Sequence, residues 1–198
     1  MYIIGLTGGI SCGKSAVAET LRRYFGAVTL DIDKITRWLL QPGGELFDVY
    51  LRHFGERVLT AEGTLDRKLI GEIIFSRPDE RAWINSVAHP VLLQRARDFL
   101  VDCSQAGARL VVLEVPLLFE AGWEILFDEI WAVYTRPDLQ LNRLMTRDNL
   151  TEEQARARIK AQMPLRKICA RADVKIFNVG GYKNIRKRVT KALRGRTF

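Results

Sequence analysis

The sequence predicts an α/β fold in which a parallel sheet of about five strands is flanked by helices. Short apolar segments rich in β-branched residues alternate along the chain with segments whose apolar residues recur at helical spacing. Strands that alternate with helices form parallel sheets covered on both faces. With 198 residues, the chain is long enough for a sizeable core with inserted subdomains.

The expected strands are short and apolar, and most of them end beside Gly, Asp, Glu or Asn. They cover residues 2–7, 27–30, 109–114, 129–134 and 174–178. Helices are expected over 14–25, 137–147 and 182–193, and from Thr151, which opens a Thr-Glu-Glu-Gln capping box. Residues 33–105 are nearly all helical in pattern, with Pro90 in the first turn of a helix of its own. This helical stretch is an insertion at the carboxyl edge of the sheet, where such folds bind ligands.

A glycine-rich loop separates the first strand from the first helix. Residues 8–15 read Gly-Gly-Ile-Ser-Cys-Gly-Lys-Ser, which matches the phosphate-loop pattern G-x-x-x-x-G-K-[ST]. In that pattern backbone N–H groups and the helix N-terminus attract phosphate, Lys14 reaches the β- and γ-phosphates, and the Ser15 hydroxyl binds Mg²⁺. A chance match is disfavoured because a strand precedes the loop and a helix follows it. The sequence therefore predicts a P-loop NTPase fold and a phosphotransferase.

Carboxylates follow two of the expected strands. Asp31 and Asp33 come after the second strand, where a carboxylate can accept a proton from a hydroxyl acceptor, hold Mg²⁺ through water, or cap the next helix. General base and helix cap stay equally open for this position. Glu114 ends the third strand, where P-loop enzymes often place an acid linked to the metal.

Two further features lie near the same edge. Arg143 and Arg147 are one helical turn apart and share a helix face, so they could clamp triphosphate oxygens from a mobile lid. Residues 114–120 are mostly apolar, which suits a groove for a partly apolar substrate but would look identical in a buried turn.

Composition limits the classes of partner. The formal net charge of +8 and a pI near 9.7 favour anionic partners, but no RRM, zinc-finger or KH signature is present, so no nucleic-acid partner is expected. For the basic segment 183–196 a solvated helix face is favoured.

No apolar run approaches the roughly 20 residues that span a bilayer, and no signal peptide is recognisable, so we expect a cytoplasmic protein without membrane contact. Cys12, Cys103 and Cys169 form neither a disulfide framework nor a zinc motif. Oligomeric state is not readable from the sequence.

The chain resembles the dephospho-coenzyme A kinase family over nearly its whole length. The resemblance starts with Gly5-Leu6-Thr7-Gly8-Gly9-Ile10 running into Gly13-Lys14-Ser15, and continues with Asp31-Ile32-Asp33 and Arg37. It extends through several further segments, which are His89-Pro90, Val115-Pro116-Leu117-Leu118-Phe119-Glu120, Arg143-Leu144-Met145, Arg147-Asp148, Gln162-Met163-Pro164, Arg171-Ala172-Asp173 and Asn178. Jointly these segments are far more specific than the phosphate loop alone.

The resemblance implies that ATP phosphorylates the ribose 3′-hydroxyl of dephospho-CoA, with Mg²⁺, to give CoA and ADP as the last step of CoA synthesis. It implies catalytic roles for Lys14, for Asp33 as the proton acceptor, and for Arg147. The residues expected to bind ATP are Gly8, Ser11, Cys12, Gly13, Lys14, Ser15, Ala16, Arg143 and Arg147. Those expected to bind the acceptor are Thr7, Asp33, Arg37, His89, Pro116, Leu117 and Leu118. Residues 1–31, 107–136 and 172–198 would form the nucleotide-binding core, 32–106 the acceptor domain and 137–171 the lid.

This chain departs from the family pattern in its phosphate loop, where Ser11-Cys12 replaces the common Gly-Ser, as well as at Ala16 and Phe177. Cys12 is expected either to be a reactive thiolate, favoured by Lys14 and a helix N-terminus, or to face away from the ligand as an inert packing residue. A nucleoside or nucleoside-monophosphate kinase is the rival enzyme class, and a P-loop regulator that binds nucleic acid is the rival outside enzymes. Against the first rival, residues 117–120 and the long helical insertion favour a larger, partly apolar acceptor. The second rival does not explain the acid after the second strand together with the lid arginines.

Overall fold

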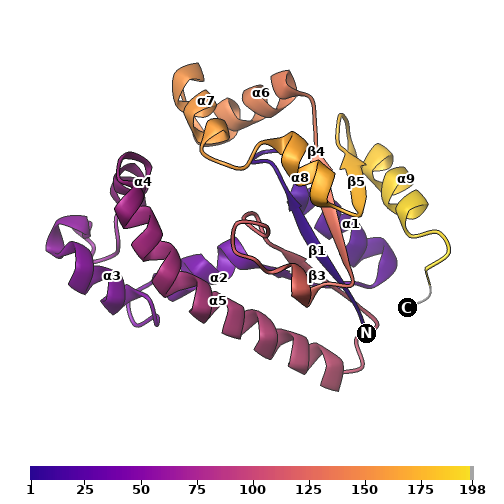
Figure 1. Cartoon of the computed structure of the whole chain (residues 1–198), viewed down its shortest axis with the longest axis horizontal. Helices are drawn as coiled ribbons and strands as arrows, with labels where there is room; N and C mark the ends of the chain where they lie inside the picture. Colours follow the sequence, from indigo (N-terminus) through magenta and orange to yellow (C-terminus); the bar gives the residue numbers. More distant parts are fainter. Residues whose placement is uncertain (197–198) are drawn as a thin grey trace. The chain divides into compact units, whose positions relative to one another are not determined.

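The computed structural model describes residues 1–196 (Figure 1). For Phe75 it describes the backbone alone. The chain divides into two compact units. One comprises Met1–Asp31 and the residues from Phe99 onward, and the other comprises Ile32–Asp98. We call them the sheet unit and the helical unit and describe each by itself.

The sheet unit contains one five-stranded sheet with the order β2-β3-β1-β4-β5 among the described residues. Every neighbouring pair is parallel, as the sequence predicts. Its strands are β1 (Tyr2–Gly8), β2 (Val28–Asp31), β3 (Leu110–Glu114), β4 (Glu129–Tyr134) and β5 (Val174–Phe177). Because β1 lies at the centre, the loop that follows it opens at the middle of the carboxyl edge of the sheet.

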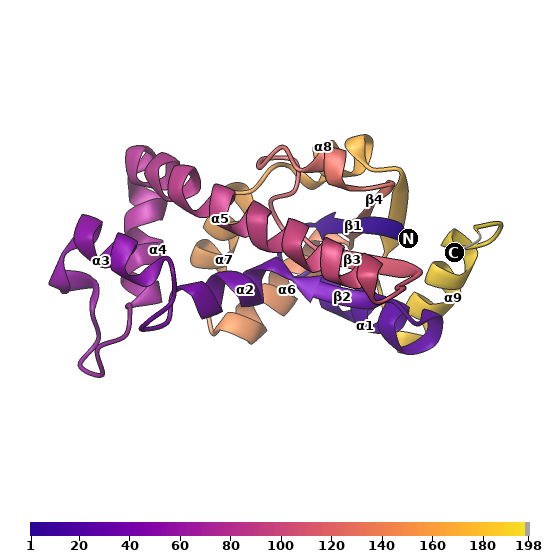
Figure 2. The ribbon, with the colours of Figure 1, turned by 90° about the horizontal axis from the view of Figure 1, so that it is seen from below.

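Helices cover both faces of this sheet. Figure 2 shows α1 and α9 on one side and α8 on the other. On the first side α1 and α9 pack against each other, while α8 contacts β1 and β4. The helices of the unit are α1 (Lys14–Phe25), α6 (Pro137–Asp148), α7 (Glu152–Lys160), α8 (Leu165–Arg171) and α9 (Tyr182–Ala192), with the 3-10 turn η2 (Glu124–Leu126). The Thr151 capping box is present at the start of α7.

The first helix explains how the loop is anchored. Val17 and Leu21 are completely buried on one face of α1, where they join a core that includes Leu6 and Trp131. Burying side chains of this size contributes roughly 1.5–3 kcal/mol each. The helix ends at Gly26, whose φ of 66° is the left-handed cap that glycine adopts without a Cβ clash. The N-terminus of α1 is therefore fixed firmly beneath the loop.

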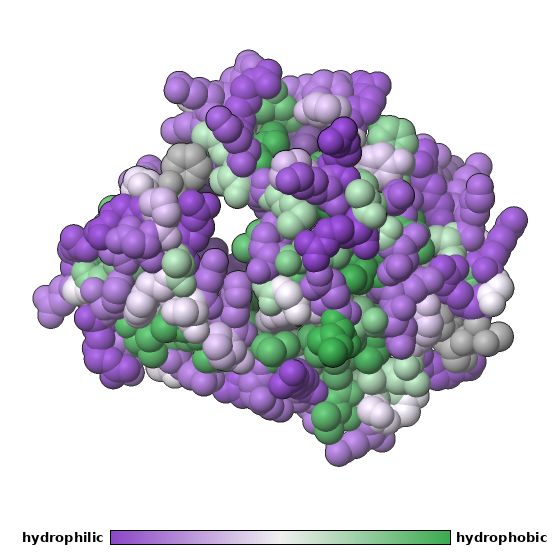
Figure 3. Space-filling model, in the orientation of Figure 1, coloured by the Kyte–Doolittle hydropathy of each residue, from purple (hydrophilic) through white to green (hydrophobic). Residues whose placement is uncertain are grey.

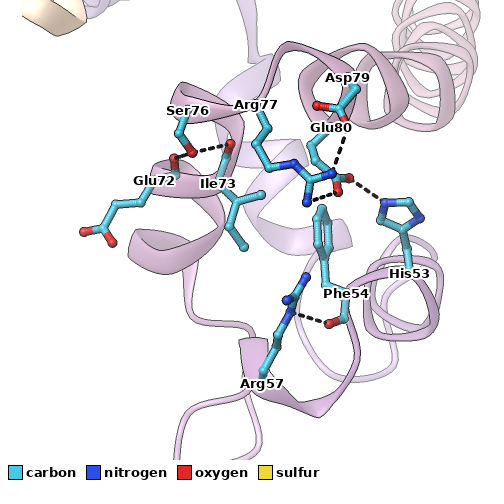
Figure 4. Close-up of polar contacts among 9 residues, drawn as sticks. All are labelled: His53, Phe54, Arg57, Glu72, Ile73, Ser76, Arg77, Asp79 and Glu80. Carbon is cyan, nitrogen blue, oxygen red and sulfur yellow. Dashed lines mark hydrogen bonds and ion pairs between the residues drawn. The ribbon is translucent and has the colours of Figure 1, made fainter.

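The helical unit has its own core. It contains α2 (Ile32–Leu39), α3 (Phe47–Phe54), η1 (Glu56–Val58), α4 (Arg67–Ser76) and most of α5 (Pro78–Gln105). Its largest polar cluster joins α3 to the start of α5 (Figure 4). There Glu80, almost buried, binds His53 at 2.6 Å and Arg77 at 3.1 Å, and the His53 ring stacks on Trp83 with centroids 3.5 Å apart.

The expected helix start at Pro90 is wrong. The structure has one continuous helix, α5, with Pro90 in its interior. Proline removes one backbone hydrogen bond at this point and leaves the carbonyl of Ser86 without its helical partner. Both Pro90 and Ser86 are exposed, so water can solvate that carbonyl. Burial of Ala88, Leu92 and Ala96 holds the helix together across the proline. Within residues 1–196, no helix is both long enough and apolar enough to traverse a bilayer.

Candidate active site

The phosphate loop requires glycine at its two ends. Gly8 has a φ of 137°, and a Cβ there would lie 2.1 Å from the Val133 carbonyl oxygen of β4. Gly13 has a φ of 92°, and a Cβ there would lie 2.1 Å from Nδ2 of Asn178. Both are left-handed conformations that side chains disfavour, and the contacted atoms are fixed. The loop therefore packs directly onto the sheet and can present its backbone N–H groups outward.

Three amides from distant segments hold the loop. Asn178, after β5, donates from Nδ2 to the Cys12 carbonyl at 2.9 Å. Gln140 of α6 donates to the Ile10 carbonyl at 2.9 Å, and Gln162 accepts from the Ile10 N–H at 2.9 Å. None of the three was predicted as a site residue, and Gln162 and Asn178 entered only as parts of the resemblance. The position of Asn178 after the last strand at the carboxyl edge was the one signal in the sequence that could have marked it.

The side chain of Lys14 folds back and contacts the backbone of its own loop. Its Nζ donates to the carbonyls of Gly8 at 3.0 Å and Gly9 at 3.3 Å. A lysine ammonium is a compact charge on a flexible stem, so it can move from these carbonyls to phosphate oxygens. The structure thus places a mobile cation directly over the anion-binding backbone.

Ser11 and Cys12, the two departures from the family loop, behave differently. Ser11 adopts a φ of 55°, which is uncommon without glycine, and its Oγ is the one buried side-chain polar atom without a hydrogen-bond partner in the described part of the chain. Cys12 is completely buried. Burial raises the pKa of its thiol, against the smaller lowering effects of Lys14 and Arg143. The reactive-thiolate expectation is therefore wrong, because desolvation outweighs the nearby positive charge.

Two carboxylates meet at the carboxyl edge beside the loop. Asp31 and Glu114 are the last residues of β2 and β3, and they are register partners in the parallel ladder. Partners in a ladder point to the same face of the sheet. Ser15 lies exposed in the first turn of α1. Hydroxyl and carboxylate oxygens at the carboxyl edge of the sheet suit Mg²⁺, which prefers oxygen ligands, keeps several waters and relies on substrate phosphates rather than a protein cage. The donor set therefore fits the expected ion.

The two lid arginines occupy different environments. Arg143 of α6 donates from Nη1 to the Asn178 carbonyl at 3.2 Å, which is also the acceptor of the Thr135 hydroxyl at 2.6 Å. Arg143 is thus connected to the loop through Asn178. Arg147 is exposed and binds Asp148 at 2.7 Å, and Asp148 also binds Arg158 at 2.9 Å. Exposed pairs of this kind are weak, so Arg147 can exchange its partner at little cost.

The segment after β3 is largely a buried turn. Leu118 is completely buried and Phe119 nearly so, whereas Leu117 is 38% exposed. The Thr7 hydroxyl donates to the Pro116 carbonyl at 3.3 Å, which ties the turn to the end of β1. Of the two alternatives for this segment, burial favours packing for Leu118 and leaves Pro116 and Leu117 at the surface.

The remaining predicted residues lie in the helical unit, except Ala16, which is partly buried in α1. Asp33 and Arg37 are four residues apart on α2 and share a face, with Asp33 in the first helical turn. Both are exposed. His89, half-buried in α5, has a pKa lowered by burial, so its neutral form is favoured. Helix α2 begins at Ile32, so Asp33 lies inside its first turn and the expectation that it is the helix cap is wrong. A favourable interaction with the helix dipole is then the structural alternative to a catalytic role.

Replacing Asn178 by alanine is expected to raise the KM for ATP several-fold and to lower the melting temperature. The change leaves the buried Cys12 carbonyl without its donor, which costs about 1–3 kcal/mol. Asn184→Ala, an exposed position on α9, is the matched control and should be silent in both measurements. Unchanged ATP kinetics with lowered stability would mean that Asn178 supports the sheet but does not shape the loop.

The chain matches the family model described as dephospho-CoA kinase over residues 2–184. Two curated proteins named dephospho-CoA kinase illustrate the similarity. One from Carboxydothermus hydrogenoformans is 40% identical over 94% of this chain and 90% of its own length. One from Shouchella clausii is 42% identical over 96% of both chains.

Solved structures agree with these matches. A Thermus thermophilus protein superposes with a TM-score of 0.79 and 33% identity, covering 97% of this chain and 95% of its own. Dephospho-CoA kinase from Campylobacter jejuni superposes with a TM-score of 0.67 and 28% identity, with the same coverage of the two chains. Shikimate kinase from Aquifex aeolicus has a TM-score of 0.52 and 17% identity, covering 98% of this chain and 96% of its own, and shares the fold alone. The phosphate loop, the parallel order of strands and these matches over almost the entire length lead to one conclusion: this chain belongs to the dephospho-CoA kinase family.

Proposed function

We propose that this chain transfers the γ-phosphoryl group of ATP to the ribose 3′-hydroxyl of dephospho-CoA, giving CoA and ADP as the final step of CoA synthesis. The observation that carries the proposal is the agreement between a complete phosphate loop and a family match that continues through the acceptor segments. The reaction uses small-molecule substrates, and we place it in the cytoplasm.

The loop residues from Gly8 to Ala16, including Ser11 and Cys12, are proposed to surround the ATP phosphates with backbone N–H groups. Lys14 leaves the Gly8 and Gly9 carbonyls and binds β- and γ-phosphate oxygens. Arg143 and Arg147 neutralise charge on the transferring group, which is the main protein contribution to this chemistry. Ser15, with Asp31 and Glu114 through water, would hold Mg²⁺, which would supply positive charge against the phosphates.

On the acceptor side, Asp33 is proposed to accept the proton of the 3′-hydroxyl. Arg37 and His89 bind the acceptor within the helical unit, and the neutral His89 favoured by burial can act as a hydrogen-bond acceptor. Thr7, Pro116 and Leu117 are proposed to contact the acceptor from the sheet unit. Leu118 supports Leu117 from below because it is buried.

An acceptor screen tests this function directly. The protein is incubated with Mg-ATP and either dephospho-CoA, adenosine, AMP or another nucleoside monophosphate, and ADP release is followed. We expect turnover with dephospho-CoA to exceed that with every other acceptor, and mass spectrometry with ³¹P NMR to place the new phosphate on the 3′-oxygen. Faster turnover with a nucleoside monophosphate would reject the proposal and favour the rival kinase class.

A further inference from the structure

Most of the net positive charge of this protein comes from α9 and the residues that directly follow it. Seven of its 31 lysine and arginine residues, and none of its 23 acidic residues, lie in residues 182–196. Without this segment the formal net charge of +8 falls to +1. The basic surplus is therefore not spread around the nucleotide site, and substrate binding does not account for it.

Helical spacing gathers part of this charge into a stripe. The residues Lys183, Lys187, Lys191 and Arg194 fall within about 80° of arc on α9 and its final turn. The opposite face of the helix carries Ile185, Val189 and Leu193, which are buried in the core of the sheet unit. All four cations are exposed, and the region over α9 is mainly hydrophilic in Figure 3.

These four cations have no ionic partners within residues 1–196. Among the described residues, none of them forms an ion pair, whereas Arg196 pairs with Glu129, and Arg188 and Arg186 lie over the Phe177 and Tyr24 rings. Like charges four residues apart destabilise a helix. Lys183, Lys187 and Lys191 have this spacing without an acid to relieve it, so the stripe is complementary to an external polyanion.

The neighbouring residues favour a nucleic-acid strand over a lipid surface. Tyr24 at the end of α1 is 45% exposed, and the Arg186 guanidinium lies 4.3 Å from its ring centroid, with Arg23 on the same ring at 5.8 Å. Exposed aromatic rings and arginine planes beside a cationic track are the elements that bind single strands. A membrane helix instead inserts an apolar face, and the apolar face of α9 is already buried.

We propose that the α9 surface, defined as Lys183, Lys187, Lys191, Arg194, Arg186, Arg23 and Tyr24, binds single-stranded RNA through its phosphates. Because α9 follows β5 and packs back along the sheet, the stripe leads away from the phosphate loop. RNA binding is therefore independent of ATP. A basic track along one helix in a protein of pI near 9.7 is the electrostatic signature of this function.

Fluorescence anisotropy with a labelled 20-nucleotide oligouridine, measured from 50 to 200 mM KCl in saturating Mg-ATP, tests the proposal. The variant Lys183→Gln/Lys187→Gln/Lys191→Gln is compared with Lys160→Gln/Lys167→Gln/Lys175→Gln, which removes three exposed lysines elsewhere in the sheet unit. We expect the α9 variant alone to lose most of its affinity. Its slope of log affinity against log salt should also become shallower by about 2, since each single-strand phosphate contact contributes roughly −0.7.

Kinase activity separates this inference from the proposed function. The α9 variant should phosphorylate the acceptor at the wild-type rate, and this activity would also show that the variant is correctly folded. Equal loss of RNA affinity in both variants would overturn the proposal, as would displacement of RNA by Mg-ATP. Vesicles of phosphatidylcholine with phosphatidylserine provide the last comparison. Binding to them with no RNA binding would identify a lipid surface and overturn the proposal.

Discussion

Replacing Lys14 by alanine is expected to lower kcat by about 10³-fold while the protein stays folded. Removing a single preorganised electrostatic contact to the transition state typically costs about 10²–10³ in kcat. Here the lost group is also in direct contact with the loop backbone, since its Nζ lies 3.0 Å from the Gly8 carbonyl oxygen. Steady-state kinetics with saturating Mg-ATP and dephospho-CoA measures the effect.

Two controls give this result its meaning. Lys175→Ala removes an exposed lysine of the same unit, on β5, and should retain full activity. Circular dichroism should show the same helix content in both variants, with a small loss of stability in Lys14→Ala because the bonds to Gly8 and Gly9 are gone. A folded Lys14→Ala protein with near-normal kcat would refute the proposed role.

Replacing Asp33 by asparagine is expected to lower kcat by about 10²–10⁴-fold, with a smaller change in the KM for dephospho-CoA. A general base contributes a rate factor of this size, and asparagine keeps the shape of the side chain but does not accept the proton. The alternative is an aspartate that only stabilises the start of α2 through the helix dipole, worth roughly 0.3–1 kcal/mol.

Asp48 offers a matched control for this alternative. It is the second residue of α3, as Asp33 is of α2, and it is exposed as well. Asp48→Asn should lose about as much thermal stability as Asp33→Asn and should keep its activity. If both variants retain kcat and lose the same stability, Asp33 acts only on its helix.

The sequence was sufficient for the core of the fold because the signals there are local. The expected helix over 14–25 matches α1 at both ends, since apolar spacing defines its face and glycines flank it. Pro90 was misread because burial of the residues around it, which the local sequence does not reveal, keeps α5 continuous. Helix α8 was not predicted, and its seven residues are too few for a periodic signal.

The site was predictable where a motif contains all the interacting residues. Gly8, Gly13 and Lys14 belong to one short pattern, and the structure places them together. Gln140 and Gln162 contact the loop from more than a hundred residues away, and an amide carries no spacing signal of its own. The sequence left two alternatives for the Cys12 thiol for a related reason: neighbouring charge is readable in the sequence, but the depth of burial that decides between them is not.

The central position of β1 has a consequence for biosynthesis. This strand is synthesised before both of its neighbours in the sheet, since Tyr2 pairs with Leu110 and Ile4 with Glu129. One hydrogen-bonding edge of β1 therefore stays open until β3 has been made, and the other until β4 has been made. Helical segments form through local contacts, whereas distant strand pairs form slowly. A nascent chain that stalls before residue 110 would carry β1 without either neighbouring strand, and an exposed apolar strand of this kind calls for chaperone protection.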